Sequence, residues 1–313
     1  KIQIKDSFFH NANSLIVKDV WKKFKFDEKI SNIEDRLWAE TVLKNNYRII
    51  YDPIPSVYHY HGVHQNNNEK RLKNVVKIIE EEMNYKSGKI NPSELNIVAI
   101  IPIKGLPKKA KKNYLIEYTI KHLKKSKFIN KIIVSTDNKT TKKIAQSLKV
   151  EVPFIRPKKY SLPKVNLEEV QEYTLSQIEK QKLFPDLVVH LEETFPFREK
   201  DLIDKMILKL LNEGLDTVIA SKRENNMLWK DNNDNNFERI DSGDVPRKFK
   251  EKSIIAYPGI GCVTYPEFIR KKSLIGKKIG LFYVKNQLNF IEVREKESFN
   301  LVNSINTILT KKK

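Results

Sequence analysis

The sequence predicts an α/β protein whose main part is a mostly parallel sheet covered by helices on both faces. Between residues 95 and 221, short apolar stretches alternate with longer amphipathic ones, and this alternation is typical of parallel strands joined by helices. Strands are expected at NIVAIIPI (96–103), KIIVSTD (131–137), VPFI (152–155), LVVHLE (187–192) and DTVIAS (216–221). Helices are expected over 114–126, 138–149, 166–181 and 199–214.

A polar stretch divides the chain. Residues 69–86 show helical spacing of apolar and charged residues, and KSGKINPSE (86–94) follows with Gly88 and Pro92. We therefore expect one domain over 1–86, a linker over 87–94 and a second domain over 95–313. The polar segment NNDNNFERIDSGD (232–244) is expected to form a loop or lid.

The charge is strongly positive but dominated by lysine. Of 59 basic residues 49 are Lys and 10 are Arg, and the net charge is +20. Direct base readers depend on Arg, and no helix-turn-helix, zinc-finger or aromatic RNA-binding motif is seen, so we expect no specific nucleic-acid partner. Phosphate-bearing small molecules or an anionic membrane surface suit the charge equally well. Apolar residues make up 40%, enough for a folded core.

Cysteine content and hydropathy suggest a cytoplasmic protein. Cys262 is the single cysteine, so an internal disulfide and a cysteine-cluster metal site are excluded. No apolar run approaches the roughly 18 residues that a membrane span requires, and no signal peptide is apparent. The chain begins at Lys1, in what reads as the middle of a fold, and we expect further sequence before it.

Several polar groups follow predicted strands. The loop 104–113, Asp137 and the segment after Leu191 all lie at carboxyl ends, where ligands bind in parallel sheets. The loop KGLPKK (104–109) matches neither G-x-x-x-x-G-K-[ST] nor G-x-G-x-x-G. By itself it is either a phosphate-binding loop or a strand-to-helix turn with solvated lysines.

The surrounding motifs distinguish these alternatives. IPIKGLPKK (101–109), VSTD (134–137), IA (144–145) and RP (156–157) occur in an order and spacing that resemble the CMP-sugar synthetases, the cytidylyltransferases that activate sialic acid and related nonulosonic acids. TFPFR (194–198) stands where that family carries T-S-P-L-R. The resemblance covers about residues 95–313 and implies a three-layer, Rossmann-like nucleotidyltransferase fold. It also implies transfer from CTP to a sugar acid with release of pyrophosphate, assisted by Mg²⁺.

The resemblance also implies roles for individual residues. Lys104 and Lys109 match loop residues that hold the triphosphate and act in catalysis, and Arg156 matches a nucleotide contact. Further nucleotide contacts are expected from Lys108, Asn113 and Asp137, and sugar contacts from Glu192, Arg198 and Arg247. For Asp137 a helix cap is the alternative.

The sequence departs from the family pattern at three places. The family's loop Arg is missing, and its cytosine-reading Asn is Ala110, with Asn113 three residues later. Glu192 replaces a sugar-contacting Gln. The family's D-I-D-T metal motif is Glu292-Val293-Arg294, which keeps one carboxylate for Mg²⁺. Arg294 either replaces part of the metal's charge, marks an inactive scaffold, or is a surface residue paired with neighbouring glutamates.

Residues 1–86 carry a different set of motifs. AN (12–13), FDE (26–28), EDRLWA (34–39), YRIIYDP (47–53) and VYHYH (57–61) resemble the C-terminal part of a family 2 (GT-A) glycosyltransferase. Asp35 matches that family's general base, and His59 and His61 match its metal ligands, with Mn²⁺ as an alternative to Mg²⁺ there. The alternatives are a helix N-terminal carboxylate and two histidines of a partly buried strand. We expect the donor-binding half to precede Lys1, so that this chain by itself should not transfer sugar.

Together the two resemblances predict enzymes of surface-glycan synthesis. The cytidylyltransferase activity is the main hypothesis, with an inactive scaffold, or glycosyltransferase activity of a longer parent protein, as alternatives. Relatives are often dimers, so a homodimer is a further expectation.

Overall fold

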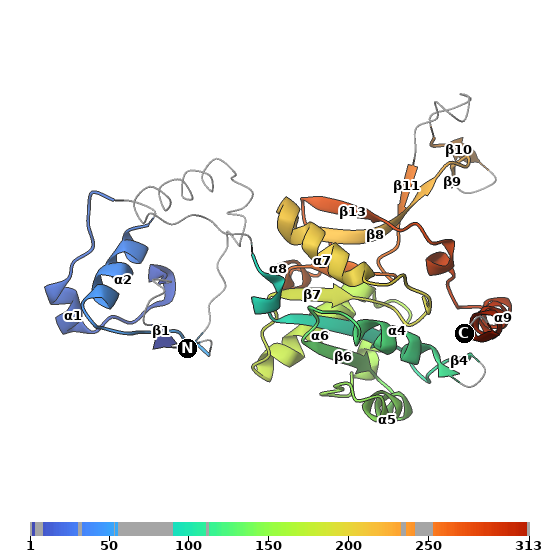
Figure 1. Ribbon diagram of the computed structural model, residues 1–313, viewed down its shortest axis with the longest axis horizontal. Coiled ribbons are helices and arrows are strands. Elements are labelled where there is room, and N and C mark those ends of the chain that lie inside the picture. The colour runs from blue at the N-terminus through green and yellow to red at the C-terminus, as the bar shows by residue number, and fades with distance from the viewer. Residues whose placement is uncertain are drawn as a thin grey trace. The chain divides into compact units, whose positions relative to one another are not determined.

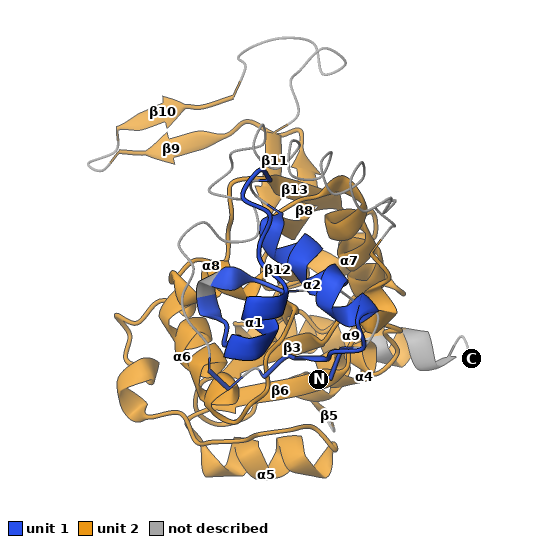
Figure 2. Cartoon of the chain, turned by 90° about the vertical axis from the view of Figure 1, so that its left-hand side faces the viewer, with its two compact units in different colours: residues 1–89 blue, residues 90–313 orange. Residues whose placement is uncertain are grey.

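The structure, a computed structural model, describes residues 2–3, 9–30, 33–52, 54–55, 90–110, 113–232, 236–241 and 253–311. The chain divides into two compact units, residues 1–89 and 90–313 (Figure 2). In the part of the chain described, no helix is both long and apolar enough to cross a bilayer. His59, His61 and Arg247 lie outside the described residues, as does the helix predicted over 69–86.

The first unit is small and helical. It contains β1 (Ile2–Gln3), η1 (Asn11–Asn13), α1 (Lys18–Lys23), α2 (Glu34–Lys44) and β2 (Ile49–Ile50). Its core forms around Trp38, Ala39 and Val42 of α2, against which aromatic residues such as Phe24 and Phe26 pack. The Trp38 indole donates to the Phe24 carbonyl oxygen at 2.9 Å, which fixes the loop before α2.

The second unit is built on a seven-stranded sheet, in the order β11-β8-β12-β7-β3-β6 with β13 also paired to β8 (Figure 1). Its strands are β3 (Ile97–Ile103), β6 (Lys131–Thr136), β7 (Leu187–His190), β8 (Thr217–Glu224), β11 (Ser253–Ala256), β12 (Cys262–Thr264) and β13 (Ile279–Tyr283). β3, β6, β7, β8 and β13 run in one direction, and β11 and β12 run against them. The predicted α/β class with a mostly parallel sheet is confirmed.

Helices cover both faces of this sheet (Figure 1). They are α4 (Leu115–Leu123), α5 (Lys139–Ser147), α6 (Leu167–Lys180), α7 (Leu202–Glu213) and α8 (Pro266–Arg270), whereas α9 (Lys296–Lys311) lies beyond the end of the sheet, against β4 (Lys109–Ala110). Side chains of β3 alternate between two cores, because successive strand residues point to opposite faces. Ile97, Ala99, Ile101 and Ile103 pack with α4, α5 and α7, whereas Val98 and Ile100 pack with α6 and α8.

Smaller elements complete the unit. They are η3 (Pro92–Glu94), β4 (Lys109–Ala110), β5 (Asn113–Tyr114), η4 (Lys158–Ser161), β9 (Trp229–Asp231), β10 (Phe237–Arg239) and η5 (Gln287–Phe290). β9 and β10 pair as an antiparallel hairpin that projects from the sheet (Figure 1). The predicted loop over 232–244 therefore contains a strand.

The expected strand over 152–155 is wrong. Glu151 makes a single bridge to Ile133, and the ladder ends there. Pro153 has no N–H to donate, so the segment cannot continue as a strand beside β6. Val152 is buried against the sheet all the same, which accounts for the apolar pattern.

Candidate functional site

The loop after β3 is anchored at Gly105. Its backbone takes a left-handed conformation with φ of 70°, which favours glycine. The Gly105 N–H donates to Asp137 Oδ1 at 2.8 Å, and its carbonyl oxygen accepts from Thr141 Oγ1 at 2.7 Å. β3 and β6 are parallel neighbours, so the loop and Asp137 meet at one edge of the sheet.

Asp137 does not cap α5. Asn138 does, since its side-chain oxygen accepts from the N–H groups of Thr140 and Thr141. Burial raises the pKa of Asp137, but the hydrogen bonds from Gly105 and Ser161 and the charge of Arg156 outweigh it, so the pKa is below its usual value. This carboxylate is therefore ionised and committed to holding the loop.

The lysines of the loop face solvent. Lys104, Lys108 and Lys109 are exposed, and the Lys109 ammonium lies 4.6 Å from the centre of the Tyr114 ring. β4 and β5 form a short antiparallel pair in which Ala110 stands opposite Asn113. Asn113 is exposed, whereas Ala110, which stands where the family carries its cytosine-reading Asn, is buried.

Arg156 lies beneath this loop and is 3% exposed. Its guanidinium donates to the carbonyl oxygens of Ser135 at 2.8 Å and Ile103 at 3.1 Å, the ends of β6 and β3. Burial lowers the pKa of Arg156, and Asp137 partly opposes that effect. The residue thus ties the two strand ends together below the position predicted for the nucleotide.

A second loop, residues 191–198, follows β7 at the same edge and is held by Arg198. The Arg198 guanidinium donates to the carbonyl oxygens of Glu192, Phe195, Gly259 and Ile260 and to Thr119 Oγ1. Burial lowers the pKa of Arg198 to about 9, with Glu192 opposing. These five bonds use its five N–H groups, so a sugar contact by Arg198 would have to displace one of them.

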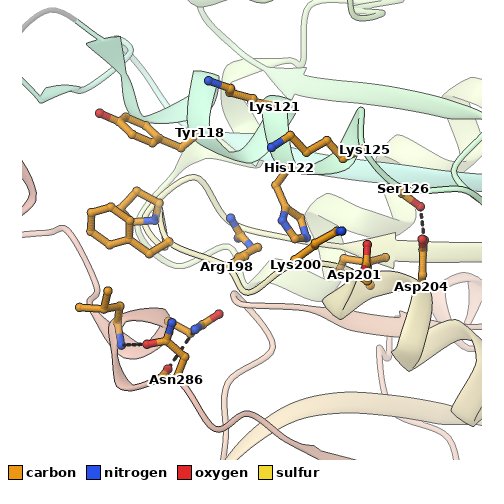
Figure 3. Close-up of a pocket in the computed structure, with 15 residues that line it drawn as sticks. Tyr118, Lys121, His122, Lys125, Ser126, Arg198, Lys200, Asp201, Asp204 and Asn286 are labelled. Atoms are coloured by element: carbon orange, nitrogen blue, oxygen red, sulfur yellow. Dashed lines mark hydrogen bonds between the residues drawn. The ribbon is translucent and has the colours of Figure 1, made fainter. Parts of the chain in front are cut away.

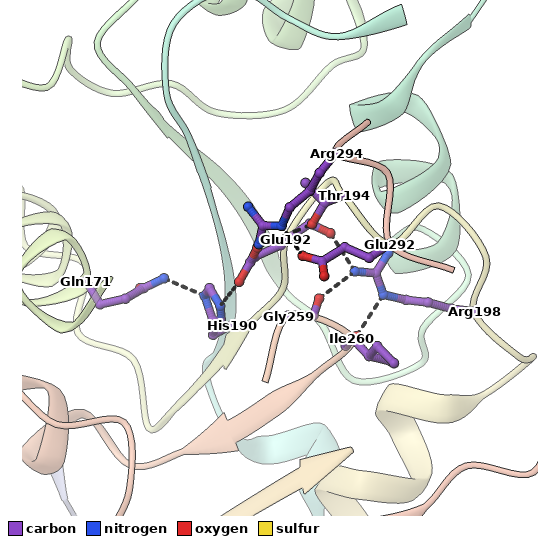
Figure 4. Close-up of polar contacts among 9 residues, drawn as sticks. All are labelled: Gln171, His190, Glu192, Thr194, Arg198, Gly259, Ile260, Glu292 and Arg294. Atoms are coloured by element: carbon purple, nitrogen blue, oxygen red, sulfur yellow. Dashed lines mark hydrogen bonds and ion pairs between the residues drawn. The ribbon is translucent and has the colours of Figure 1, made fainter. Parts of the chain in front are cut away.

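Glu192 stands at the centre of a polar group (Figure 4). His190, at the end of β7 and fully buried, has Nε2 3.9 Å from Glu192 Oε1, and its Nδ1 is 2.7 Å from Gln171 Nε2 of α6. Arg294 approaches Glu192 Oε2 at 3.5 Å. Burial raises the pKa of Glu192, but His190, Arg294 and Thr194 together bring it below the usual value, so the carboxylate is ionised.

Arg294 also pairs with Glu292. The Val293 N–H donates to the Thr194 carbonyl oxygen at 2.8 Å, which aligns residues 292–294 with the 191–198 loop. The interpretation of Arg294 as paired with a neighbouring glutamate is confirmed. Within the described ranges no three His, Cys, Asp or Glu side chains are grouped to hold a metal ion. Glu292 is engaged by Arg294 in this structure, and its expected contact with Mg²⁺ stays a prediction.

Glu193 is a buried carboxyl that the sequence analysis missed. It is 6% exposed, and its Oε2 has no hydrogen-bond partner. Burial raises the pKa of Glu193 to about 7, and the charge of Lys108 offsets part of the rise. This electrostatic contact relates the 191–198 loop to the basic loop. His190 was also missed, although one polar residue within the apolar run LVVHL was a visible signal.

Asp35, in the first unit, lies in the first turn of α2. Its two carboxylate oxygens accept from the backbone N–H groups of Asn11 at 3.1 Å and Arg36 at 2.8 Å. These bonds, and a carboxylate at a helix N-terminus, suit the alternative structural reading of this residue. Its catalytic role stays a prediction.

Comparisons with known proteins agree with this geometry. Residues 104–256 match the family model described as cytidylyltransferase. A solved 4-diphosphocytidyl-2C-methyl-D-erythritol synthase from Anaerococcus prevotii DSM 20548 is 16% identical with a TM-score of 0.51, covering 68% of this chain and 99% of that one. A CMP:2-keto-3-deoxy-manno-octonic acid synthetase solved with CTP is 10% identical with a TM-score of 0.48, covering 70% and 100%. No curated protein sequence matches the chain. The structural likeness is one of fold, and the expected enzyme class is confirmed by the family match.

Proposed function

We propose that the chain transfers a cytidylyl group from CTP to a hydroxyl group of a sugar acid and releases pyrophosphate, because residues 104–256 match the cytidylyltransferase family model. The observation that carries the proposal is the pair of loops at one sheet edge. The loop after β3 presents exposed lysines on a turn that is fixed by Asp137. The loop after β7 presents the ionised Glu192 carboxylate and is held by the hydrogen bonds of Arg198.

The basic loop suits the nucleotide. As the acceptor oxygen bonds to the α-phosphorus, the bond from that phosphorus to the bridging oxygen breaks, pyrophosphate leaves, and the hydroxyl proton is released. The triphosphate and the leaving pyrophosphate are strongly negative and call for cations that face solvent, which Lys104, Lys108 and Lys109 supply. Arg156 and Asp137 would act beneath them by fixing the loop, and Asn113 is proposed to read the base.

The other loop suits the acceptor. Glu192 is proposed to accept a hydrogen bond from a sugar hydroxyl, because its ionised carboxylate is a strong acceptor. Arg294, with its side chain 59% exposed beside Glu192 and Glu292, is the described cation best disposed toward the sugar's carboxylate. Arg247 is retained as a proposed sugar contact, and Glu292 as a proposed ligand of the Mg²⁺ that accompanies CTP.

Calorimetric titration of the full chain tests this proposal. CTP should bind more tightly than UTP or ATP, and Mg²⁺ should strengthen binding if it accompanies the triphosphate. Lys104→Ala should abolish measurable CTP binding, whereas Lys143→Ala, an exposed lysine on α5, should leave it unchanged. Both variants should unfold at the wild-type temperature because neither side chain is buried.

Two outcomes would redirect the proposal. Absence of binding to any nucleotide would favour an inactive scaffold, the alternative that the Arg294–Glu292 pair supports. Unchanged CTP affinity in Lys104→Ala would remove the basic loop from the nucleotide site. The glycosyltransferase resemblance of residues 1–86, with Asp35, His59 and His61 as its proposed site, calls for a separate sugar-transfer assay.

A further inference from the structure

A pocket with a volume of about 360 Å³ lies between α4, η5 and the segment that leads into α7 (Figure 3). This volume falls within the range of small-molecule sites. Its lining includes no residue of the basic loop 104–114, and Glu192, Glu292 and Arg294 do not border it. The pocket is therefore separate from the candidate nucleotide and acceptor positions, although Arg198 borders both it and the 191–198 loop.

Positive charge predominates in this pocket. Lys121, Lys125 and Lys200 all line it, and all three are exposed. Two carboxylates also line it, Asp201 and Asp204. Asp204 is engaged elsewhere, because it accepts from Ser126 Oγ and from the Lys127 N–H. This leaves Asp201 as the remaining carboxylate in a lining that also holds three lysines.

His122 reports the electrostatic field inside the pocket. Burial first, and then the charges of Arg198 and Lys125, lower the pKa of His122 to about 4, although the charge of Asp201 opposes them. The ring is therefore neutral at physiological pH. Figure 3 shows it between the Lys125 and Arg198 side chains. Burial is the largest cause, but the effects of Arg198 and Lys125 each exceed the opposing effect of Asp201, and the resulting positive potential at the ring favours an anion.

The remaining walls limit the kind of anion. Tyr118 and Phe197 both line the pocket and contact each other edge to face, with ring centroids 6.3 Å apart. Such a wall suits an organic group better than a free inorganic ion. Three lysines in the lining of one pocket suit a group with nearly two negative charges, which a phosphate monoester carries at neutral pH and a single carboxylate does not.

We propose that this pocket is a second ligand site, which binds a small phosphate monoester with its phosphate among Lys121, Lys125 and Lys200 and its organic part against Tyr118 and Phe197. The proposal does not depend on the reaction at the basic loop. A molecule bound here would lie against Arg198, the residue that holds the carbonyl oxygens of Glu192 and Gly259.

The test uses the full chain and phenyl phosphate, a probe with both a dianionic phosphate and a ring. The imidazole resonances of His122 are followed by NMR, with ionic strength kept constant by sodium chloride. Phenyl phosphate should shift them saturably and raise the pKa of His122 from about 4, because an opposite charge favours the protonated ring. Inorganic phosphate should bind more weakly, and phenol should not bind.

Variants locate the site. The double variant Lys125→Gln/Lys200→Gln should weaken phenyl phosphate binding at least about tenfold, since two charge-assisted contacts are lost. Lys143→Gln on α5 is the matched surface control and should bind as the wild type does. Lys104→Gln should also leave the His122 response unchanged, which separates this pocket from the nucleotide loop.

Three results would overturn the proposal. They are a His122 shift reproduced by sodium chloride alone, a response that survives in the double variant, or a response lost in Lys104→Gln. Both lysines of the double variant are exposed, so it should fold, and its unfolding temperature checks this directly.

Discussion

The two loops that border the candidate site are built in opposite ways. The loop after β3 presents exposed lysines and is fixed through the backbone of Gly105, which is bonded to Asp137 and Thr141. The loop after β7 carries buried side chains, and one guanidinium, Arg198, binds four backbone carbonyl oxygens and a threonine hydroxyl around it. Both leave parallel strands at the same edge of one sheet.

This difference indicates separate roles for the two loops, one adjusting to the nucleotide and the other holding Glu192 in place. Exposed lysines on a short anchored turn can adjust to a triphosphate, because each is a flexible point charge. The loop after β7 cannot adjust in this way, because Arg198 makes five hydrogen bonds around it, so the Glu192 carboxylate is held in one place. If the comparison is correct, substitutions in the second loop should mainly reduce stability, and those under the first should mainly reduce nucleotide affinity.

Replacing Arg198 should have the largest effect on the free energy of unfolding. Arg198→Met leaves several buried carbonyl oxygens without donors, and we expect a loss of about 3–5 kcal/mol in the free energy of unfolding. Urea denaturation measures it. Arg223→Met, which removes an exposed arginine lying over the Tyr283 ring, should cost at most about 1 kcal/mol. Equal losses in the two variants would show that the five bonds of Arg198 do not hold the loop.

The role of Arg198 also marks a limit of sequence interpretation. The sequence TFPFR (194–198) predicts a sugar contact through a family resemblance. The hydrogen-bond partners of Arg198 include Thr119, Gly259 and Ile260, which are distant in sequence, as well as Glu192 and Phe195 of the loop itself, and their proximity depends on how the strands pair. No local spacing encodes that arrangement.

Local patterns nevertheless predicted most of the second unit. The alternation of strands and helices predicted α4, α5, α6 and α7 to within a few residues, because each has an apolar stripe, and α5 and α6 also begin at a capping asparagine, Asn138 and Asn166. The pairing of Arg294 with Glu292 followed from two residues of an extended segment sharing a side. The contact of Arg294 with Glu192 could not follow, since about 100 residues separate them.

A pH-dependent effect should come from Glu193. Its pKa is raised to about 7 in the fold from 4.5, so its contribution to stability is complete below pH 4.5 and is lost as the pH rises through 7. The shift corresponds to about 3 kcal/mol between those limits. Glu193→Gln cannot ionise, and its free energy of unfolding should therefore lack this decline between pH 5 and pH 8.

Thermal or urea unfolding across that pH range provides the measurement. Glu295→Gln, which changes an exposed glutamate, should keep the wild-type pH dependence. A constant offset of Glu193→Gln at every pH is compatible with the prediction, because the amide introduces polar groups of its own. An unchanged slope would show that Glu193 is ionised throughout and that the second loop is less enclosed than the comparison requires.

Removing the anchor of the first loop should have a smaller effect on stability and a clear one on ligand binding. Asp137→Ala frees the Gly105 N–H, which should cost about 1–2 kcal/mol and lower CTP affinity about tenfold as the loop loses its fixed position. The pKa of Asp137 is lowered in the fold, so its contribution is present near neutral pH and fades as the pH falls toward acid.

A matched control exists at the opposite edge of the sheet. Asp186 Oδ2 accepts from the Asn96 N–H at 2.7 Å, just before β3 begins. Asp186→Ala should reduce stability by a similar amount without changing CTP affinity in the calorimeter. Similar losses of affinity in the two variants would mean that general destabilisation, and not the position of the basic loop, controls nucleotide binding.

The smallest effect on stability should follow the loss of Arg294. Its side chain is 59% exposed, and exposed ion pairs contribute little, so Arg294→Ala should change the free energy of unfolding by less than about 1 kcal/mol. Arg270→Ala, which breaks the surface pair with Glu179, is the matched comparison and should behave alike.

The pKa of Glu192 should nevertheless rise in Arg294→Ala, because one of the groups that favour its ionised form is gone. Titration of the Glu192 carboxyl by NMR measures this rise. A loss of unfolding free energy well above 2 kcal/mol in Arg294→Ala would instead show that Arg294 stabilises the loop as Arg198 does. The contrast between Arg198, which holds the loop, and Arg294, which faces the acceptor position, would then fail.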